Sequence, residues 1–302
     1  MNIKKRIPWQ LKLLAKLVID RIPFISNAFW THMRLYSLGA MEQPEYAYKV
    51  FKQHFDVVEF PRKIGGFTFL ELGPGDSLFT ALVAHALGAS KVYLIDAGAY
   101  ARYDRRKYQA MADFIAKQGL APPRIGGNLE DTLEGCSAKY LTKGLYSLRA
   151  IPSQSLDFVF SQNVLEHVRR AEFTQTQQEL YRILRFTGVC SHVVDLKDHL
   201  GYALNNLRFS KNIWETFASP GFYTNRIRYS EMSAIFESVG FCIEHVQPEL
   251  WATLPTPKHV LAKPYRELPD DELKVKGFKI VLRKSSSKNI SARVEEATNP
   301  RR

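Results

Sequence analysis

The chain has 302 residues, 45% of them hydrophobic, which is enough for one large domain with additions or for two small ones. No apolar run approaches the roughly 18 residues that span a bilayer, and the cysteines Cys136, Cys190 and Cys242 form no CxxC pair, so a disulfide framework and a zinc site are excluded and we predict no metal. Lysine and arginine outnumber aspartate and glutamate by 42 to 30. The net charge of +12 indicates either that the protein has an anionic partner or that charged tails flank a near-neutral core.

Residues 1–60 are predicted to form a helical extension. Its first helix would be basic and amphipathic, with Lys12 and Lys16 beside an apolar face of Leu11, Leu13, Leu14, Leu17 and Val18. We favour a cap on the main domain, because the apolar face must be buried somewhere; the alternative is peripheral contact with the inner membrane surface. The lysines interrupt the apolar stretch and no small-residue cleavage site follows it, so we predict a cytoplasmic protein without a signal peptide. A second helix is expected near 44–55.

From residue 67 onward, short apolar runs alternate with helical patterns of about ten residues. The expected strands are 67–72, 92–95, 139–141, 156–160, 189–194, 241–246 and 278–283, and the expected helices are 78–87, 108–117, 173–184 and 230–239, with Ser230 as a cap. Residues 120–137 are expected to be a loop, and the polar tail 285–302 is expected to be disordered. This alternation predicts an α/β fold with a parallel sheet covered by helices on both faces.

A glycine turn follows the first strand. Gly73 and Gly75 permit a tight turn and close approach of a ligand at the carboxyl edge of the sheet. Asp96 ends the second strand, 21 positions after Gly75, where a carboxylate accepts hydrogen bonds from ribose hydroxyls; the alternative is a turn cap. Asp76 and Glu71 would repel a pyrophosphate but not a sulfonium or an ammonium group. This pattern of charge favours S-adenosyl-L-methionine over a dinucleotide.

The sequence Glu71-Leu72-Gly73-Pro74-Gly75 resembles motif I of the class I S-adenosylmethionine-dependent methyltransferases, and Asp96 resembles their ribose-binding acid. Residues 156–168 are similar to their fourth strand and the following turn. The resemblance implies a Rossmann-like, seven-stranded, mostly parallel sheet with its last strand antiparallel, within a domain at 61–284. It implies cofactor contacts at Glu71, Gly73, Gly75, Asp76, Asp96, Ser161, Gln162 and Asn163. Two departures are Ser77, where a third glycine is usual, and the absence of the usual proline from 185–188.

The turn after the fourth strand bears on the acceptor. It reads Ser161-Gln162-Asn163-Val164, without the D/N-P-P-Y/F motif of DNA amino-methyltransferases, and no cysteine follows a proline, as cytosine C5 enzymes require. We therefore predict no DNA substrate. The stretch 164–168 resembles the branch that methylates small molecules, lipids or glycans. The remaining alternatives are an RNA methyltransferase and a non-catalytic nucleoside-binding protein.

Two histidines at the carboxyl edge are candidate general bases. His167 follows the fourth strand, and His199 follows the fifth, where Asp195 or Asp198 would orient it. The alternative is that they brace a helix or a solvated loop. Residues 201–230 and 247–277 are expected to be insertions that form a lid over the substrate. The aromatic and arginine residues of 221–229 would then contact an anionic or sugar group, or simply form a connector.

Overall fold

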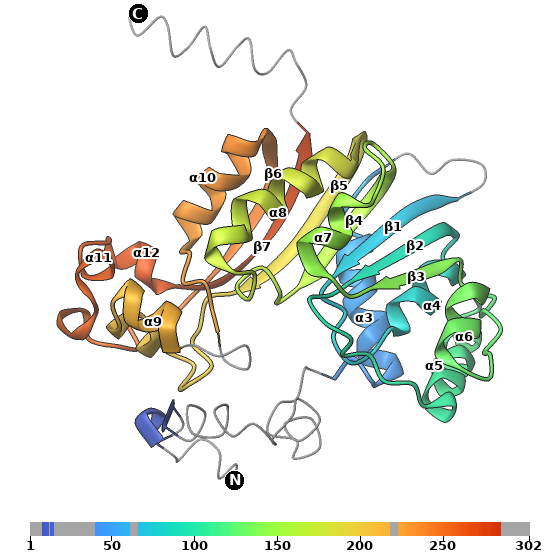
Figure 1. The fold of residues 1–302 in the computed structure, drawn as a ribbon, viewed down its shortest axis with the longest axis horizontal. Coiled ribbons are helices and arrows are strands. Elements are labelled where there is room, and N and C mark those ends of the chain that lie inside the picture. The colour runs from blue at the N-terminus through green and yellow to red at the C-terminus, as the bar shows by residue number, and fades with distance from the viewer. Residues whose placement is uncertain (1–7, 12, 15–39, 61–65, 218–222, 285–302) are drawn as a thin grey trace, which may run out of the picture.

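The computed structural model describes residues 8–11, 13–14, 40–60, 66–217 and 223–284 (Figure 1). The predicted tail at 285–302 and most of the predicted N-terminal extension lie outside the described residues. None of the helices within the described ranges is long and apolar enough to cross a membrane.

Seven strands form one mixed sheet in the order β3-β2-β1-β4-β5-β7-β6. Their bounds are β1 Phe67–Leu72, β2 Ala89–Ile95, β3 Ala138–Leu141, β4 Leu156–Gln162, β5 Leu184–Asp195, β6 Phe241–Leu250 and β7 Val275–Lys284. The pairs among β1 to β5 are parallel, whereas β7 runs antiparallel to β5 and β6, with Asp195 opposite Gly277 and Val189 opposite Arg283. The predicted Rossmann-like sheet with an antiparallel last strand is confirmed.

Helices cover both faces of the sheet (Figure 1). On one face lie α3 Pro44–Phe55, α4 Phe79–Ala86 and α5 Arg105–Lys117, with α6 Leu129–Gly135 beside them. On the other face lie α7 Gly144–Arg149, α8 Arg170–Ile183 and α10 Tyr229–Val239. Each face buries its own apolar cluster against the strands, as expected for a parallel sheet that is shielded from water on both sides.

Helix α3 belongs to the packed core. Pro44 stands in its first turn, where a missing backbone N–H costs no hydrogen bond. Phe51 is fully buried and makes edge contacts with Phe69, Phe158 and Phe160, at centroid distances from 5.2 to 6.3 Å. The helix therefore presses an aromatic face onto β1 and β4 and helps to fix the carboxyl edge at which those strands end.

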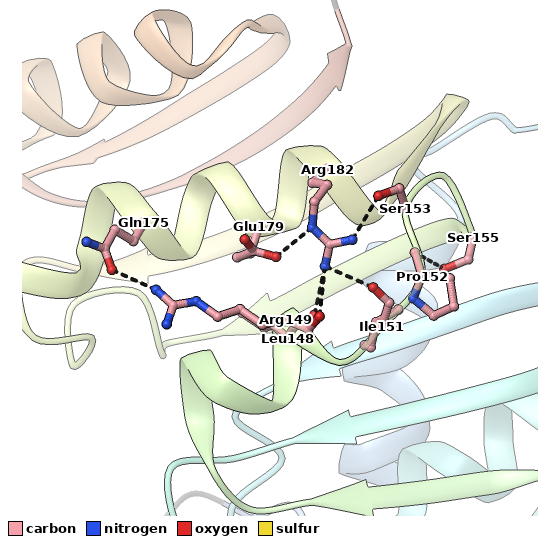
Figure 2. A network of polar contacts seen from close by, with 9 residues as sticks. All are labelled: Leu148, Arg149, Ile151, Pro152, Ser153, Ser155, Gln175, Glu179 and Arg182. Carbon is pink, nitrogen blue, oxygen red and sulfur yellow. Dashed lines mark hydrogen bonds and ion pairs between the residues drawn. The ribbon is translucent and has the colours of Figure 1, made fainter.

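Arg182 braces α8 against the loop that precedes β4 (Figure 2). Its guanidinium donates to the carbonyls of Leu148 and Ile151 at 3.2 and 2.9 Å, to Ser153 Oγ at 2.9 Å and to Glu179 at 2.7 Å. Leu148 is in the last turn of α7, where its carbonyl also accepts the Ile151 N–H at 3.1 Å, and Ile151 follows the helix. One cation thus closes the junction between α7, β4 and α8.

The structure corrects three local predictions. The loop expected at 120–137 contains α6, because Asn128 caps it by accepting the Asp131 N–H at 2.8 Å. Helix α7 was not predicted; it is a short turn over Gly144–Arg149. Ser230 is not a cap: α10 begins at Tyr229 after Arg228, although Gly240 does end it in the left-handed conformation.

Two segments outside the sheet lie beside each other at its carboxyl edge. The first contains η2 Asn205–Arg208 and α9 Lys211–Phe217, and the second contains η3 Lys258–Val260, α11 Lys263–Arg266 and α12 Asp270–Lys274. They share a small apolar cluster of Leu204, Leu207, Leu261 and Leu273. We call the described part of these segments, residues 200–217, 223–228 and 251–274, the lid.

Candidate active site

The glycine turn after β1 is closed by backbone contacts. Gly73 and Gly75 have φ of +75° and +73°, in the left-handed region that favours glycine. The Gly73 N–H donates to the Ile95 carbonyl at 2.7 Å, which ties the turn to the end of β2. A Cβ on Gly73 would stand 2.4 Å from a methyl of Val164, in the turn after β4. The three strand ends are therefore packed too closely for any side chain at this position.

Asp96 lies beside this turn, as the sequence predicts. Its Oδ2 accepts the Gly75 N–H at 2.9 Å and its Oδ1 accepts the Ala97 N–H at 2.8 Å. The two bonds hold the carboxylate in one orientation, and each oxygen keeps a lone pair for a further donor. Burial raises the pKa of Asp96, while the two amide donors oppose that shift. Asp96 therefore caps the turn, and its expected contact with ribose hydroxyls stays a prediction.

Glu71 and Asp76 add two acids to the same turn. Glu71 is 2% exposed and accepts a hydrogen bond from Thr80 Oγ1 of α4; burial raises its pKa to about 8. Asp76 is half-buried, its Oδ1 has no partner among the described residues, and burial raises its pKa. A buried acid without a cation is poorly solvated, so both groups favour a ligand that brings positive charge and N–H donors.

Ser161, Gln162 and Asn163 differ in placement. Ser161 is fully buried, and its Oγ lies 2.8 Å from His192 Nδ1, so its hydroxyl is directed into the core. Gln162 Oε1 accepts from His54 Nε2 at 3.0 Å. Asn163 is exposed, with φ of +55°, at the carboxyl edge. Of the three, Asn163 is the side chain best placed to meet a ligand, while the other two hold the end of β4.

Two buried histidines near this edge were not among the predicted site residues. His54 of α3 bonds Gln162 and also Ser191 Oγ, at 2.8 Å, and it stacks on Phe160 at 4.5 Å. Burial lowers the pKa of His54 to about 4 and that of His192 to about 3, so both are neutral near pH 7. No sequence signal separates them from ordinary core residues, because their partners are more than 30 positions away.

The predicted bases His167 and His199 lie together. Their rings stack at 4.9 Å with an interplanar angle of 13°, and their Nε2 atoms are 3.1 Å apart. His167 Nδ1 lies 2.8 Å from the Tyr223 carbonyl, which can only accept, so this nitrogen carries the proton. In the neutral pair, His167 Nε2 then accepts from His199 Nε2–H.

The acids expected to orient His199 have other partners. Asp195 Oδ1 accepts the Lys197 N–H and pairs with its Nζ, both at 2.9 Å. Asp198 is 1% exposed and caps the following turn by accepting the backbone N–H groups of Leu200 and Asn205, at 2.9 and 2.6 Å. The prediction that Asp195 or Asp198 orients His199 is therefore replaced by a contact with His167. The contact between the two histidines was not predictable from the sequence, because they are 32 positions apart.

Comparison with known proteins identifies the domain. Residues 70–191, which include the glycine turn and Asp96, match a family model described as a methyltransferase domain. Residues 70–191 belong to this family of methyltransferase domains, and the seven-stranded sheet that contains them is of the Rossmann-like type. No curated protein matches the sequence of this methyltransferase.

Several solved structures are similar to the methyltransferase. An S-adenosylmethionine-dependent methyltransferase from Mesorhizobium loti is 16% identical, with 82% of this chain and 100% of that chain covered and a TM-score of 0.45. A putative one from Listeria monocytogenes is 16% identical, with 81% and 100% covered and a TM-score of 0.43. The Burkholderia thailandensis 1,6-didemethyltoxoflavin-N1-methyltransferase is 11% identical, with 90% and 89% covered and a TM-score of 0.45. At TM-scores below 0.5, none of them identifies the acceptor.

The residues of the methyltransferase fit its cofactor. The paired oxygens of Asp96 suit the ribose hydroxyls, and the orphaned Asp76 Oδ1 and the buried Glu71 suit the ammonium and sulfonium charges. Ser77 Oγ, also buried and without a partner among the described residues, offers one more polar contact. A dinucleotide would place a pyrophosphate against three acids, so this charge distribution discriminates against it.

The arginines of the predicted lid segment do not face an open site. Arg226 and Arg228 are 5% and 3% exposed. Arg226 donates to the carbonyls of Asn206 and Phe209, and Arg228 donates to those of Leu196 and Val275. These arginines hold the lid together, and the prediction that they contact an anionic or sugar group is wrong, because their hydrogen bonds go to backbone carbonyls inside the fold.

Proposed function

We propose that this methyltransferase transfers the methyl group of S-adenosyl-L-methionine to a protic nucleophile on a small molecule or on a glycan or lipid intermediate. The observation that carries the proposal is the His167–His199 pair, at the carboxyl ends of β4 and β5. Strand β4 lies between β1 and β5, so the pair is one strand away from the glycine turn. A base here stands on the acceptor side of the cofactor.

The histidine pair supplies an oriented acceptor for one proton. When bound, the cofactor supplies a methyl group already activated on a sulfonium, so much of the catalysis is alignment. His199, in its pair with His167, takes the proton of the acceptor hydroxyl or amine as the new bond to carbon forms and the carbon–sulfur bond breaks. The positive charge on His199 is shared with His167 through their 3.1 Å contact, and the Tyr223 carbonyl holds His167 in place. Asp195 neutralises Lys197 nearby and keeps that ammonium from opposing the protonation.

The N-terminal helical turn contributes to the acceptor side. Trp9 packs edge-on against Phe209 at 6.1 Å, and the Arg208 guanidinium lies 5.2 Å from the centre of its ring. This supports the cap on the lid for the described part of that segment. Leu11 and Leu14 remain 56% and 58% exposed, which supports peripheral contact with the inner membrane surface in addition. We place the enzyme in the cytoplasm, where the free, buried Cys136 and Cys190 remain thiols.

A second candidate is an RNA methyltransferase, favoured by the net charge of +12. The two acceptor classes differ in salt dependence. Binding to RNA weakens steeply between about 50 and 200 mM salt when several phosphates are contacted, whereas binding of a small neutral acceptor does not.

The test has two steps. Calorimetry with S-adenosylmethionine first establishes that the cofactor binds, with NAD as the negative control. A radiolabelled methyl group is then followed into separated lipid, glycan, small-molecule and RNA fractions of a cell extract. Label in one of the first three supports the proposal, and label confined to RNA selects the alternative. Binding without transfer to any fraction would show a non-catalytic nucleoside-binding protein.

A further inference from the structure

A small hollow lies between the lid and the ends of β4 and β5. Its volume is about 10 Å³, and its lining includes Glu166 after β4, Asp195 at the end of β5, and Asn206, Arg226 and Arg228 of the lid. Space of this size holds about one water molecule. Three segments that are distant in sequence therefore meet around a single solvent-sized site.

Five buried polar atoms on these lining residues have no hydrogen-bond partner among the described residues. They are Glu166 Oε1 and Oε2, Asn206 Oδ1, Arg226 Nε and Arg228 Nε. All four side chains are at most 5% exposed. Buried polar atoms are nearly always paired with protein or with ordered water, so a cluster of orphans around one hollow indicates an occupant.

The chemistry of these atoms selects water. The two arginine Nε–H groups donate, whereas the Asn206 oxygen accepts. Burial raises the pKa of Glu166 well above its ordinary value, although the nearby backbone N–H groups of Glu166 and Asp195 oppose the shift, and a neutral carboxyl both donates and accepts. A chloride ion could only accept, and a metal cation would meet two guanidinium groups. Water alone accepts from two donors and donates to two acceptors at the same point.

We propose that one water molecule fills this hollow and that Glu166, through it, is the positioning residue that couples the lid to the His167–His199 pair. The inference rests on the proposed function for the meaning of the pair, but the site itself does not depend on it. Glu166 immediately precedes His167 in the turn after β4. A fixed Glu166 side chain therefore fixes the backbone from which the His167 ring projects.

Backbone contacts carry the coupling onward. The Asn225 N–H donates to the Glu166 carbonyl at 2.7 Å, and Asn225 Nδ2 donates to the Leu165 carbonyl at 2.7 Å. Two residues earlier in the lid, the Tyr223 carbonyl accepts from His167. Arg226, one residue later, has φ of +58°, a left-handed conformation that a non-glycine residue keeps only when its surroundings enforce it. The water would link the Glu166 side chain to those of Asn206, Arg226 and Arg228, across the same contact between the β4 turn and the lid that these backbone bonds make.

The test compares Glu166→Gln with Glu166→Leu in the full chain. An amide still pairs with water, so Glu166→Gln should match wild type. Glu166→Leu removes the polar lining and should increase amide hydrogen exchange at 224–228 at least tenfold. It should also shift the histidine ring NMR titrations and lower kcat more than it changes KM. The matched control is Gln177→Leu, which removes a fully buried side chain of α8 whose amide also lacks a partner, and which should leave those titrations unchanged.

Two results would overturn the proposal. One is a wild-type crystal structure near 1.8 Å resolution in which the hollow contains no water density. The other is Glu166→Leu with wild-type exchange at 224–228 and wild-type histidine titrations. If Glu166→Leu does not fold, Asn206→Leu replaces it with the same readouts. Exchange and titration need no acceptor, so they can fail while methyl transfer succeeds, and the failure of the proposed function is separately visible as absent transfer.

Discussion

The cofactor side and the acceptor side of this methyltransferase are built in different ways. At the ends of β1 and β2, the site is mostly backbone: a turn with positive φ at Gly73 and Gly75, and an acid, Asp96, that accepts two amides. At the ends of β4 and β5, the site is made of side chains: His167 contacts His199 and is held by the Tyr223 carbonyl of the lid, which comes much later in the chain. The first kind of site is fixed by local sequence, and the second by tertiary packing.

The largest effect is expected on the acceptor side. His199→Ala removes the proposed base, so kcat should fall by about 10²–10⁴-fold, the usual contribution of a general base. The affinity for S-adenosylmethionine should stay within about twofold, because no described contact joins His199 to the glycine turn. Single-turnover methyl transfer and calorimetry measure the two quantities. Normal turnover would remove His199 as the base and leave the acceptor side without one.

On the cofactor side, Asp96→Ala removes both the ribose acceptor and the brace of the Gly75 and Ala97 amides. We expect the dissociation constant for S-adenosylmethionine to rise at least tenfold, about 1.4 kcal/mol. Asp96→Asn is the matched variant, since it keeps one acceptor oxygen and should lose less. Calorimetry that gives an unchanged dissociation constant for the alanine variant would disprove the ribose assignment.

Removal of the Arg182 brace, which is far from both the cofactor side and the acceptor side, should lower stability without changing methyl transfer. Arg182→Ala leaves the Ile151 carbonyl without its donor and removes one of the donors to the Leu148 carbonyl, so the free energy of unfolding should fall by about 1–3 kcal/mol. Denaturant titration measures it, and Arg149→Ala, which loses only an exposed bond to Gln175, is the control. A changed cofactor affinity in Arg182→Ala would mean that the two sides are less independent than the contacts indicate.

A smaller effect should appear as pH dependence. Glu71, with a pKa raised to about 8 by burial, is mostly neutral at pH 7, and a cationic cofactor favours its carboxylate. Affinity should therefore increase from pH 6.5 to 8, by at most about tenfold per pH unit, and level off above. Calorimetry across this range should show the slope in wild type and its loss in Glu71→Gln. An equal slope in both proteins would exclude Glu71 as its source.

The free protein gives the opposite slope. A carboxyl whose pKa is raised on folding stabilises the fold fully at pH below its unfolded value and loses that stabilisation as pH increases through about 8. Denaturant titrations without cofactor should show the free energy of unfolding decreasing from pH 6 to 9. Glu71→Gln should flatten this decrease.

The difference between the two sides also decides what the sequence can predict. Strand β1, the glycine turn and Asp96 follow from a short apolar run, two glycines and a spacing of 21 residues, all of which are local patterns. The seven-stranded sheet follows from the alternation of strands and helices together with the resemblance to a known family. Helix α6 was missed because Gly126 and Gly127 indicate a loop, although Asn128 then caps a helix.

Contacts between distant segments explain the remaining differences. His199 was found as a candidate by its place after β5, but its partner His167 is on another strand, and no periodicity records which side chains meet across a sheet edge. The partners of Arg226 and Arg228 were also not predictable from sequence. The composition of their segment indicated substrate contacts, but their hydrogen bonds go to the carbonyls of Asn206 and Leu196. These arginines become buried only when the lid segments pack together, so the sequence of the basic segment alone does not predict their burial.

The antiparallel strand has a consequence for how the chain is assembled. Strand β6 joins the sheet only through β7, which follows it in sequence and separates it from β5. During synthesis, the nascent chain must therefore wait for residues 275–284 to leave the ribosome before β6 can find its place. We expect truncation of the chain after residue 274, which removes β7, to release β6 as well, whereas added C-terminal tags should leave the sheet complete.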